Sequence, residues 1–284
     1  MTFKLKKDTK YIFATDLDGT FLTSFVHSLH IDSYEMIEKI KENGHHFVIA
    51  TGRSWWWTKT IYEQIGSIDA SIHFSGAIVH HPRLDNFNEF RSSISQIIIK
   101  NMLKKIDVWS FATRTQAVGR KFHATWSKGD DVNKLFFNCY EYIIEYEKSK
   151  NSEPELLAKI AREMGEGYVY RVWNLFGESE RKCIIISPKG TSKSEGLKKV
   201  AEYYEIPKEN VVYFGDNIND LDALEWAGYS FAPSNALEVA KETADEVLKL
   251  SCEEGAVPKK IIELINEQNG QTKWKKFTHH KTNT

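Results

Sequence analysis

A short apolar run that ends at two carboxylates constrains the fold of this chain more than any other segment does. Residues 11–15 are aromatic, aliphatic or β-branched, and Asp16, Leu17, Asp18 and Gly19 follow them. Such a run predicts a buried strand, and a glycine after it allows a turn that a Cβ would hinder. While the strand persists, side chains two residues apart point to one face, so the two carboxylates would lie side by side.

Two carboxylates at an apolar strand end repel each other and are poorly solvated, so they either share a proton or face a cation. Mg²⁺ prefers oxygen ligands and would in turn attract a phosphate. A magnesium site is therefore one interpretation of Asp16 and Asp18. A strand that ends in a solvated Asp-x-Asp-Gly turn is the other, and this segment alone does not distinguish them.

Length and composition are those of an ordinary globular chain. The 284 residues suffice for one large domain or two of average size. Hydrophobic residues at 41% and charged residues at 27% exclude a disordered or fibrous chain. A formal charge of −1 argues against a dedicated nucleic-acid binder, which would carry a strong basic excess.

The chain carries no sign of export or membrane insertion. Its first ten residues are polar and lysine-rich, and no stretch approaches 18 consecutive apolar residues, so we expect neither a signal segment nor a membrane span. Cys139, Cys183 and Cys252 are odd in number, far apart and without metal-ligand spacing, and they are interpreted as reduced core thiols of a cytoplasmic protein. Residues 271–284 are polar and basic, and we expect a frayed tail without a binding role.

Both ends of the chain predict a parallel α/β sheet. A helix within residues 32–44 precedes an apolar strand at 46–50, and a third strand is expected at 71–75. Strand, helix and strand at this spacing form a parallel crossover unit. A helix at 192–204 and a buried strand at 211–214 resume the pattern. Trp55, Trp56 and Trp57 open a further helix, and at least one of them should be exposed because three adjacent side chains cannot share one helix face.

The pattern of polar and apolar residues changes in the middle of the chain. Its expected strands alternate, are rich in aromatic residues and have one polar face, which suggests an open sheet covered by helices on one side. The sequence predicts strands at 110–115, 121–127, 168–174 and 182–187, and helices at 92–106, 131–148 and 154–164. We therefore predict an α/β core made of residues 1–82 and 187–270, interrupted by an inserted α+β domain at 83–186.

Polar residues gather where the predicted core strands end. In open α/β sheets ligands bind beyond the carboxyl ends of the strands, and four such ends carry polar residues: Asp16 and Asp18, Thr51 and Gly52, Ser75 and Gly76, Asp216 and Asp220. Thr51 and Gly52 open a helix, which makes an anion site of their free N–H groups. Lys193 lies in the first turn of a helix and can neutralise a phosphate.

These segments together resemble the motifs of the haloacid dehalogenase superfamily, and within it the Cof-like phosphatases. The matching segments are Asp16–Thr20, Thr51–Arg53, Lys193 and Gly215–Asp220. The resemblance extends from about residue 10 to 265. It implies a Rossmann-like core with an α/β cap inserted between the second and third motifs. The change in residue pattern independently predicted an inserted domain at the same place.

The resemblance implies a role for each matching residue. Asp16 would attack phosphorus and become an aspartyl-phosphate, while Asp18 would protonate the leaving oxygen and then deprotonate the attacking water. Mg²⁺ would be the cofactor, with a metal set of Asp16, Asp18 (through its carbonyl), Asp216 and Asp220. The phosphate-binding set would be Thr51, Gly52, Lys193 and Asn219, the last of which could instead support the metal.

Specificity is expected to come from the cap. Cof-like proteins commonly carry Asn-Gly-Ala after the third strand, whereas this chain has Ser75-Gly76-Ala77, so contacts at that rim should differ. The cap residues expected to face a substrate are Arg114, Arg120, His123, Trp126, Arg171 and Trp173. Because aromatic rings stack on sugar faces, a sugar phosphate is the first prediction, and a nucleotide or cofactor phosphate is the second.

Three functions follow from this chemistry. The leading one is a Mg²⁺-dependent phosphatase of small phosphorylated metabolites, acting as a monomer or homodimer without nucleic-acid or membrane partners. A phosphomutase would need extra cations in the cap to rebind a bisphosphorylated intermediate. A non-catalytic module switched by aspartyl phosphorylation is the third, although Asp18 would speed loss of the phosphoryl group and a large cap is unnecessary for a switch.

Overall fold

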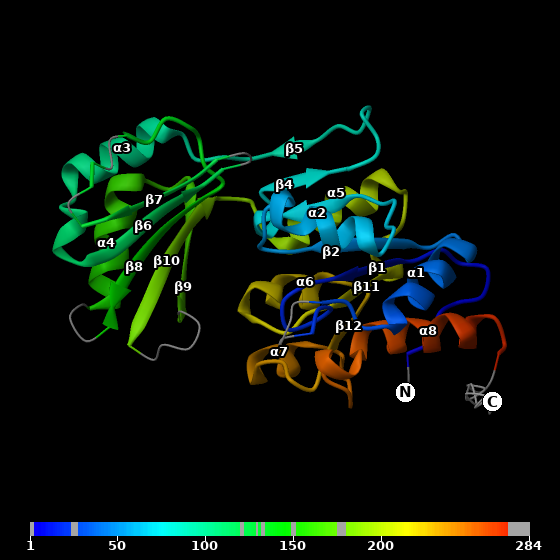
Figure 1. Cartoon of the computed structure of the whole chain (residues 1–284). Helices are drawn as coiled ribbons and strands as arrows, with labels where there is room; N and C mark the ends of the chain where they lie inside the picture. Colours follow the sequence, from blue (N-terminus) through cyan, green and yellow to red (C-terminus); the bar gives the residue numbers. More distant parts are fainter. Residues whose placement is uncertain are drawn as a thin grey trace, which may run out of the picture.

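The computed structural model describes residues 3–23, 28–119, 122–128, 130–131, 134–148, 152–174 and 180–271. Two sheets organise it, joined by two connections near one end of the larger sheet (Figure 1). The strands of the two sheets are, in chain order, β1 (Ile12–Thr15), β2 (His46–Ala50), β3 (Ser71–His73), β4 (Ile78–His80), β5 (Phe90–Arg91), β6 (Ala112–Val118), β7 (His123–Ser127), β8 (Glu141–Glu147), β9 (Tyr168–Asn174), β10 (Arg181–Pro188), β11 (Val211–Phe214), β12 (Tyr229–Ala232) and β13 (Glu246–Val247). Its α-helices are α1 (Asp32–Glu42), α2 (Trp55–Gln64), α3 (Gln96–Lys105), α4 (Glu153–Met164), α5 (Lys193–Tyr203), α6 (Leu221–Trp226), α7 (Glu238–Thr243) and α8 (Ala256–Gln268).

The larger sheet has eight strands in the order β13-β12-β11-β1-β2-β3-β4-β5. The six strands from β13 to β3 are parallel, and β4 and β5 add an antiparallel edge. In the centre, Ile12 of β1 pairs with Val211 of β11 on one side and with His46 of β2 on the other. The sheet is therefore the parallel α/β core that the sequence predicted.

Helices cover both faces of the larger sheet because its strands alternate between two apolar clusters. Phe13 and Phe47 pack with α1, α2 and α8 on one face. Ala14 and Val48 pack with α5, α6 and α7 on the other. Burial on both faces is what apolar parallel strands require, and it leaves only the strand ends for polar chemistry.

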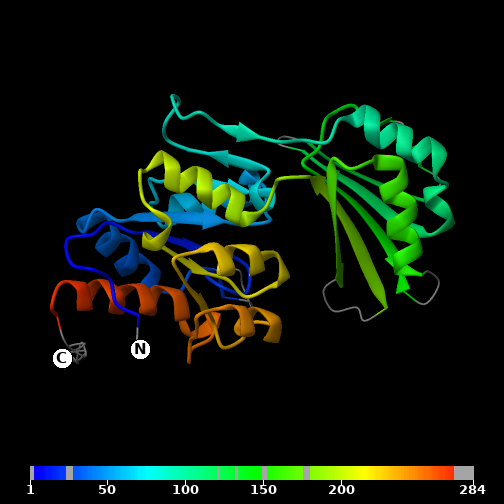
Figure 2. The same ribbon diagram turned by 180° about the vertical axis from the view of Figure 1, so that it is seen from behind.

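The smaller sheet is antiparallel, with the order β7-β6-β8-β10-β9. Tyr142, Ile144 and Tyr146 of β8 join a separate apolar cluster with residues of α3 and α4. Both helices lie on the side of this sheet that is turned away from the larger sheet (Figures 1 and 2). The remaining face, called here the open face, carries no helix in the described part of the chain, which agrees with the predicted α+β unit.

One predicted element of the smaller unit is wrong. A helix was expected over 131–148, whereas residues 141–147 form β8, the central strand of the smaller sheet. Every second residue of β8 is buried, as a strand with one covered face requires. The predicted helix over 154–164 is confirmed by α4, and the predicted strand over 168–174 by β9.

The larger sheet draws its strands from residues 12–91 and 211–247, and the smaller one from 112–188. The predicted boundary at residue 82 falls between β4 and β5, which pair with each other. The domain boundaries stay a prediction, and residues 272–284 of the expected tail lie outside the described part.

Smaller predictions about side chains hold. Cys139, Cys183 and Cys252 are buried free thiols. Trp56 and Trp57 are 79% and 67% exposed.

No helix in the described segments combines the length and apolarity needed to cross a bilayer.

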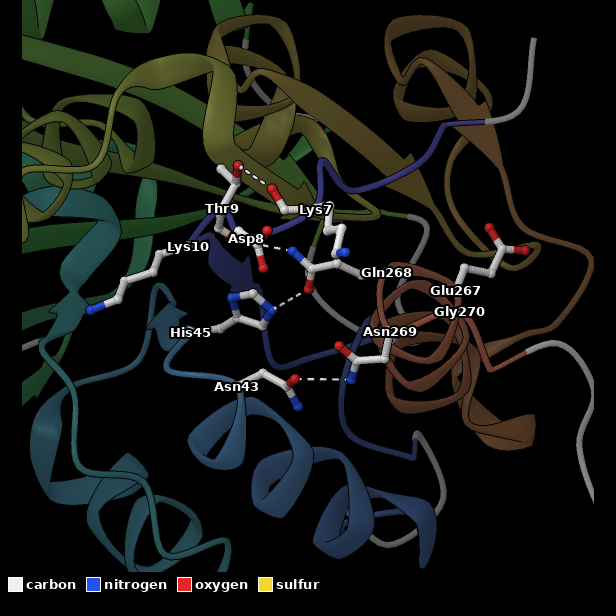
Figure 3. A pocket seen from close by; sticks show the side chains of 10 residues that line it. All are labelled: Lys7, Asp8, Thr9, Lys10, Asn43, His45, Glu267, Gln268, Asn269 and Gly270. Atoms are coloured by element: carbon white, nitrogen blue, oxygen red, sulfur yellow. Dashed lines mark hydrogen bonds between the residues drawn. The ribbon is translucent and has the colours of Figure 1, made fainter.

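A polar clasp closes the core at the amino-terminal ends of β1 and β2. Buried His45 accepts a hydrogen bond at Nδ1 from the N–H of Tyr11 (3.2 Å) and donates from Nε2 to Oε1 of Gln268 (2.9 Å). Nε2 of Gln268 donates in turn to the carbonyls of Lys6 and Thr9. A polar cavity of about 560 Å³ lies beside these contacts (Figure 3). Because its side chains bond mainly to one another and to the backbone, we interpret it as structural.

The clasp predicts a stability effect. Gln268→Ala removes the acceptor of the buried imidazole and two donors to carbonyls, so the free energy of unfolding in urea should fall by about 1–3 kcal/mol. Glu267→Ala is the matched control, because Glu267 lines the same cavity without a side-chain hydrogen bond among the described residues. Equal losses in the two variants would contradict the clasp.

Candidate active site

Four polar segments meet at the carboxyl edge of the larger sheet. Asp16 directly follows β1, Thr51 follows β2, Ser75 follows β3 by one residue, and Asp216 follows β11 by one. The N–H of Asp16 bonds to the carbonyl of Phe214 at 3.0 Å, and the N–H of Ser75 bonds to the carbonyl of Thr51 at 3.1 Å. The strand ends that the sequence predicted to converge are therefore neighbours.

Lys193 is the buried centre of this edge. It is the first residue of α5 and its side chain is fully buried. Its Nζ lies 2.8 Å from Oδ1 of Asp16 and 2.6 Å from Oδ1 of Asp220. Burial lowers the pKa of Lys193, but the two carboxylates outweigh it and raise the pKa above its usual range. The lysine is a fixed positive charge between two acids.

Asp220 is held entirely by the protein. Its Oδ1 accepts from Lys193 and from the hydroxyl of Tyr213 at 2.5 Å. Its Oδ2 accepts from the N–H groups of Asp216 (3.1 Å) and Asn217 (3.0 Å). A carboxylate offers about four acceptor positions, so these bonds fill all of them. Asp220 therefore has no acceptor position left and connects Lys193 to the backbone of Asp216 and Asn217.

Asp216 is fixed more loosely and keeps an oxygen available. Its Oδ1 accepts from the hydroxyl of Thr20 at 2.6 Å, and Oδ2 makes no hydrogen bond within the described segments. Gly19 passes close by, with φ of +79°, and a Cβ there would lie 2.4 Å from Oδ2 of Asp216. A glycine is therefore required where the backbone turns around this carboxylate.

The acids can hold a cation. One oxygen from each of Asp16, Asp216 and Asp220 lies within 4.8 Å of the others, and all three side chains are buried. Hard carboxylate oxygens are the ligands that Mg²⁺ prefers. Asp16 and Asp216 each have one oxygen without a donor in the described part of the chain, so the donor set fits Mg²⁺.

The same crowding raises the proton affinity of the acids. Burial raises the pKa of Asp16 to about 8, with Lys193 opposing the rise and the carboxylates of Asp220 and Asp216 adding to it. Burial also raises the pKa of Asp216 to about 7, and Asp220 adds to the effect. Near neutral pH a cation therefore competes with protons for these oxygens.

Asp18 lies apart from the buried cluster. The strand ends at Thr15, so Asp16 and Asp18 do not share a strand face as the sequence suggested. The side chain of Asp18 is 40% exposed and pairs with the guanidinium of Arg53, whose Nε donates to Oδ2 at 2.7 Å and whose second amino group bonds to Oδ1. No role was predicted for Arg53, although its place beside Thr51 and Gly52 in the second motif was a signal.

Thr51, Gly52, Ser75 and Asn219 form one wall. The hydroxyl of Thr51 accepts from the N–H of Arg53 at 3.1 Å. A Cβ built on Gly52 would lie 3.7 Å from Oγ of Ser75 and 3.9 Å from Nδ2 of Asn219. The predicted phosphate-binding residues Thr51, Gly52 and Asn219 are thus adjacent, and Lys193 reaches the neighbouring Asp16.

The predicted cap residues divide between the faces of the smaller sheet. Arg114, His123 and Arg171 lie on its open face. Trp126 was expected to face a substrate, but it is 7% exposed and packs into the apolar cluster with α3 and α4, because its position in β7 places it on the covered face. Arg120 and the side chain of Trp173 lie outside the described residues.

A charged network on the open face was not predicted. Glu145 of β8 is 1% exposed, and its Oε1 accepts from Nε of Arg114 and from Nε2 of Gln116, both at 2.6 Å. Arg181 donates to Oε2 at 2.9 Å. The open face is therefore polar and rich in hydrogen-bonding groups.

A model of the haloacid dehalogenase-like hydrolases matches residues 13–261. The match covers most of the chain, so the protein belongs to this family, and the resemblance to its Cof-like branch is confirmed.

Curated relatives of the chain are phosphatases. The 5-amino-6-(5-phospho-D-ribitylamino)uracil phosphatase YitU of Bacillus subtilis is 26% identical over 271 residues, which cover 86% of this chain and 94% of that protein. The putative phosphatase YkrA of the same organism is 28% identical, over 87% and 95% of the two chains. The protein is accordingly an enzyme of the phosphoric monoester hydrolase class.

Solved structures agree on the fold. TM0651 from Thermotoga maritima has a TM-score of 0.71 at 22% identity, covering 90% of this chain and 97% of that one. BT1666 from Bacteroides thetaiotaomicron, reported among phosphatases of the superfamily, has a TM-score of 0.74 at 19% identity, covering 90% and 95%.

The raised pKa values predict proton-coupled Mg²⁺ binding. Below about pH 7 the carboxyl groups of Asp16 and Asp216 carry protons that a cation must displace, so the affinity for Mg²⁺ should rise with pH between about 6 and 8 and then level off. Calorimetry in two buffers of different ionisation enthalpy would measure the released protons. Asp216→Asn should weaken Mg²⁺ binding and lower the number of protons released, because Asp16 alone then gives up a proton. Glu225→Gln on the surface of α6 should leave both unchanged, and binding that is independent of pH would contradict the prediction.

Proposed function

We propose that the protein is a Mg²⁺-dependent phosphatase of a small phosphorylated metabolite and that it works through an aspartyl-phosphate on Asp16. The observation that carries the proposal is the buried ion pair of Lys193 with Asp16, beside an acidic cluster that fits Mg²⁺. Phosphate-ester hydrolysis is extremely slow in water and needs accelerations of up to about 10²¹-fold. Positioning and charge stabilisation supply most of that acceleration.

Asp16 is the nucleophile in this proposal. Lys193 holds Oδ1, which leaves Oδ2 to form the new bond to phosphorus while the bond from phosphorus to the ester oxygen breaks. Asp18 donates a proton to the departing oxygen, because an unprotonated alkoxide is a poor leaving group. Two donors from Arg53 hold the carboxyl group of Asp18 in place.

A second displacement releases phosphate. Asp18, now deprotonated, accepts a proton from a water molecule as the water oxygen bonds to phosphorus, and the bond between phosphorus and Oδ2 of Asp16 breaks. Both acids return to their starting states. Splitting the reaction into two displacements makes each of them easier than direct hydrolysis.

The phosphoryl group needs positive charge and donors around it. Thr51, the N–H of Gly52, Asn219 and Lys193 would provide them. Mg²⁺, when bound, would neutralise developing negative charge on the phosphoryl oxygens. Asp216, the carbonyl of Asp18 and Oδ1 of Asp16 would hold it, because Oδ1 has a second acceptor position beside the one that Lys193 fills and Oδ2 of Asp16 is the attacking atom. Asp220, predicted as a ligand, would instead hold Lys193 and the loop, because its acceptor positions are filled.

The proposed substrate carries a phosphorylated sugar or sugar alcohol. The polar open face with Arg114, Gln116 and Glu145 suits hydroxyl groups and polar ring edges. A relative named for 5-amino-6-(5-phospho-D-ribitylamino)uracil supports a ribityl phosphate with a pyrimidine ring as one such substrate. Nucleotide and cofactor phosphates are the second class. Three free thiols support a cytoplasmic location, and a monomer or homodimer stays a prediction.

Asp16→Asn tests the nucleophile. The change preserves size but removes the attacking oxygen, so phosphate release should fall by about 10³-fold or more. Glu225→Gln, at an exposed acid nearby on α6, is the control and should keep wild-type turnover. Near-normal release by Asp16→Asn in a folded protein would rule out the mechanism.

Phosphate release from a substrate panel tests the function. The panel holds an aryl phosphate, sugar phosphates, nucleotides and 5-amino-6-(5-phospho-D-ribitylamino)uracil, each with Mg²⁺ and with EDTA. Metal-dependent release that favours the sugar or ribityl phosphates is expected. Isomerisation without release would identify a phosphomutase, and a lasting phosphoenzyme without turnover would identify a switch.

A further inference from the structure

The turn after β3 has an unusual backbone. Phe74 and Ser75 both lie in the left-handed region, with φ of +50° and +47°. A Cβ disfavours this conformation, so such residues persist only where their surroundings hold them, often at functional sites. Gly76 follows with φ of +96°.

Contacts on three sides hold this turn. The N–H of Ser75 bonds to the carbonyl of Thr51 at 3.1 Å. A Cβ on Gly76 would lie 2.0 Å from the carbonyl oxygen of Ser192, the residue before Lys193. Phe74 stacks on Tyr140, which leads into β8 of the smaller sheet, with ring centroids 5.1 Å apart. The turn therefore packs between the segments that carry Thr51 and Ser192 on one side and the smaller sheet on the other.

The left-handed turn presents the hydroxyl of Ser75 beside Gly52. Ser75 is 5% exposed, and its hydroxyl makes no hydrogen bond to any described residue. The amide of Asn219, which is only partly buried, lies next to the same Gly52 and makes no side-chain hydrogen bond within the described segments. A polar side chain as buried as that of Ser75 normally has a partner. Its place beside the free N–H of a proposed phosphate site indicates that a ligand supplies the missing acceptor.

We propose that the Ser75 hydroxyl is a further phosphate-binding group, which donates to a phosphoryl oxygen beside the N–H of Gly52. The proposal rests on the proposed phosphatase function. The backbone conformation serves this contact, because it turns the short serine side chain into the site while the main chain stays bonded to Thr51.

Substitution of Ser75 by glycine tests the hydroxyl without straining the backbone. Ser75→Gly keeps the left-handed conformation without strain but removes the donor. With Mg²⁺ present, its dissociation constant for inorganic phosphate, measured by calorimetry, should rise about tenfold, as for the loss of one hydrogen bond to a charged group. Ser75→Ala should show a similar rise. Ser75→Asn should bind close to wild type, because asparagine tolerates this conformation and has a donor.

The outcomes separate this inference from the function. Wild-type phosphate affinity in Ser75→Gly, or a loss confined to Ser75→Ala, would overturn the role of the hydroxyl while leaving the phosphatase intact. If the wild-type enzyme with Mg²⁺ neither binds phosphate nor hydrolyses an aryl phosphate, the function fails and this inference with it. Thermal unfolding of each variant verifies that the turn has kept its fold.

Discussion

The buried ammonium of Lys193 is the interaction on which the rest of the site depends. Asp16 and Asp220 are both held by it, and burying their negative charges without a partner would be costly. Lys193 owes its position to the start of α5, where Gly76 passes against the backbone of Ser192. The packing of one helix start therefore determines where Asp16, Asp220 and the wall around Gly52 lie relative to one another.

The two sheets differ in which surfaces they leave free for polar groups. The larger sheet buries both faces and exposes its chemistry only at strand ends, which gives acids and donors fixed positions. The smaller sheet buries one face, so the other is available for polar groups such as the network around Glu145. The two sheets therefore provide separate polar surfaces, one with the acids at the strand ends and one with the network on the open face.

The predictable part of the molecule is the part fixed by periodicity. Asp16, Thr51 and Asp216 were predicted to meet because parallel strands end at one edge. The strand character of β8 was missed because Ile143 on its open face interrupts the alternation of polar residues with Tyr142, Ile144 and Tyr146. The pairing of Arg53 with Asp18 and the left-handed Ser75 were not foreseen either, since both depend on contacts between segments distant in sequence. The side of β7 that buries Trp126 likewise depends on register rather than composition.

The pairing of the strands also has a consequence for synthesis of the chain. The smaller sheet is built from the continuous segment 112–188 and has its own apolar cluster. The centre of the larger sheet joins Ile12 to Val211, and α8 closes the clasp with His45 only near residue 268. As the chain emerges from the ribosome, the smaller sheet can therefore fold before β11 is available to pair with β1. Until then one edge of β1 is unpaired, and unpaired strand edges promote aggregation. The edge that carries the acids is the last to be assembled, and a chain that stops before residue 211 lacks Asp216 and Asp220.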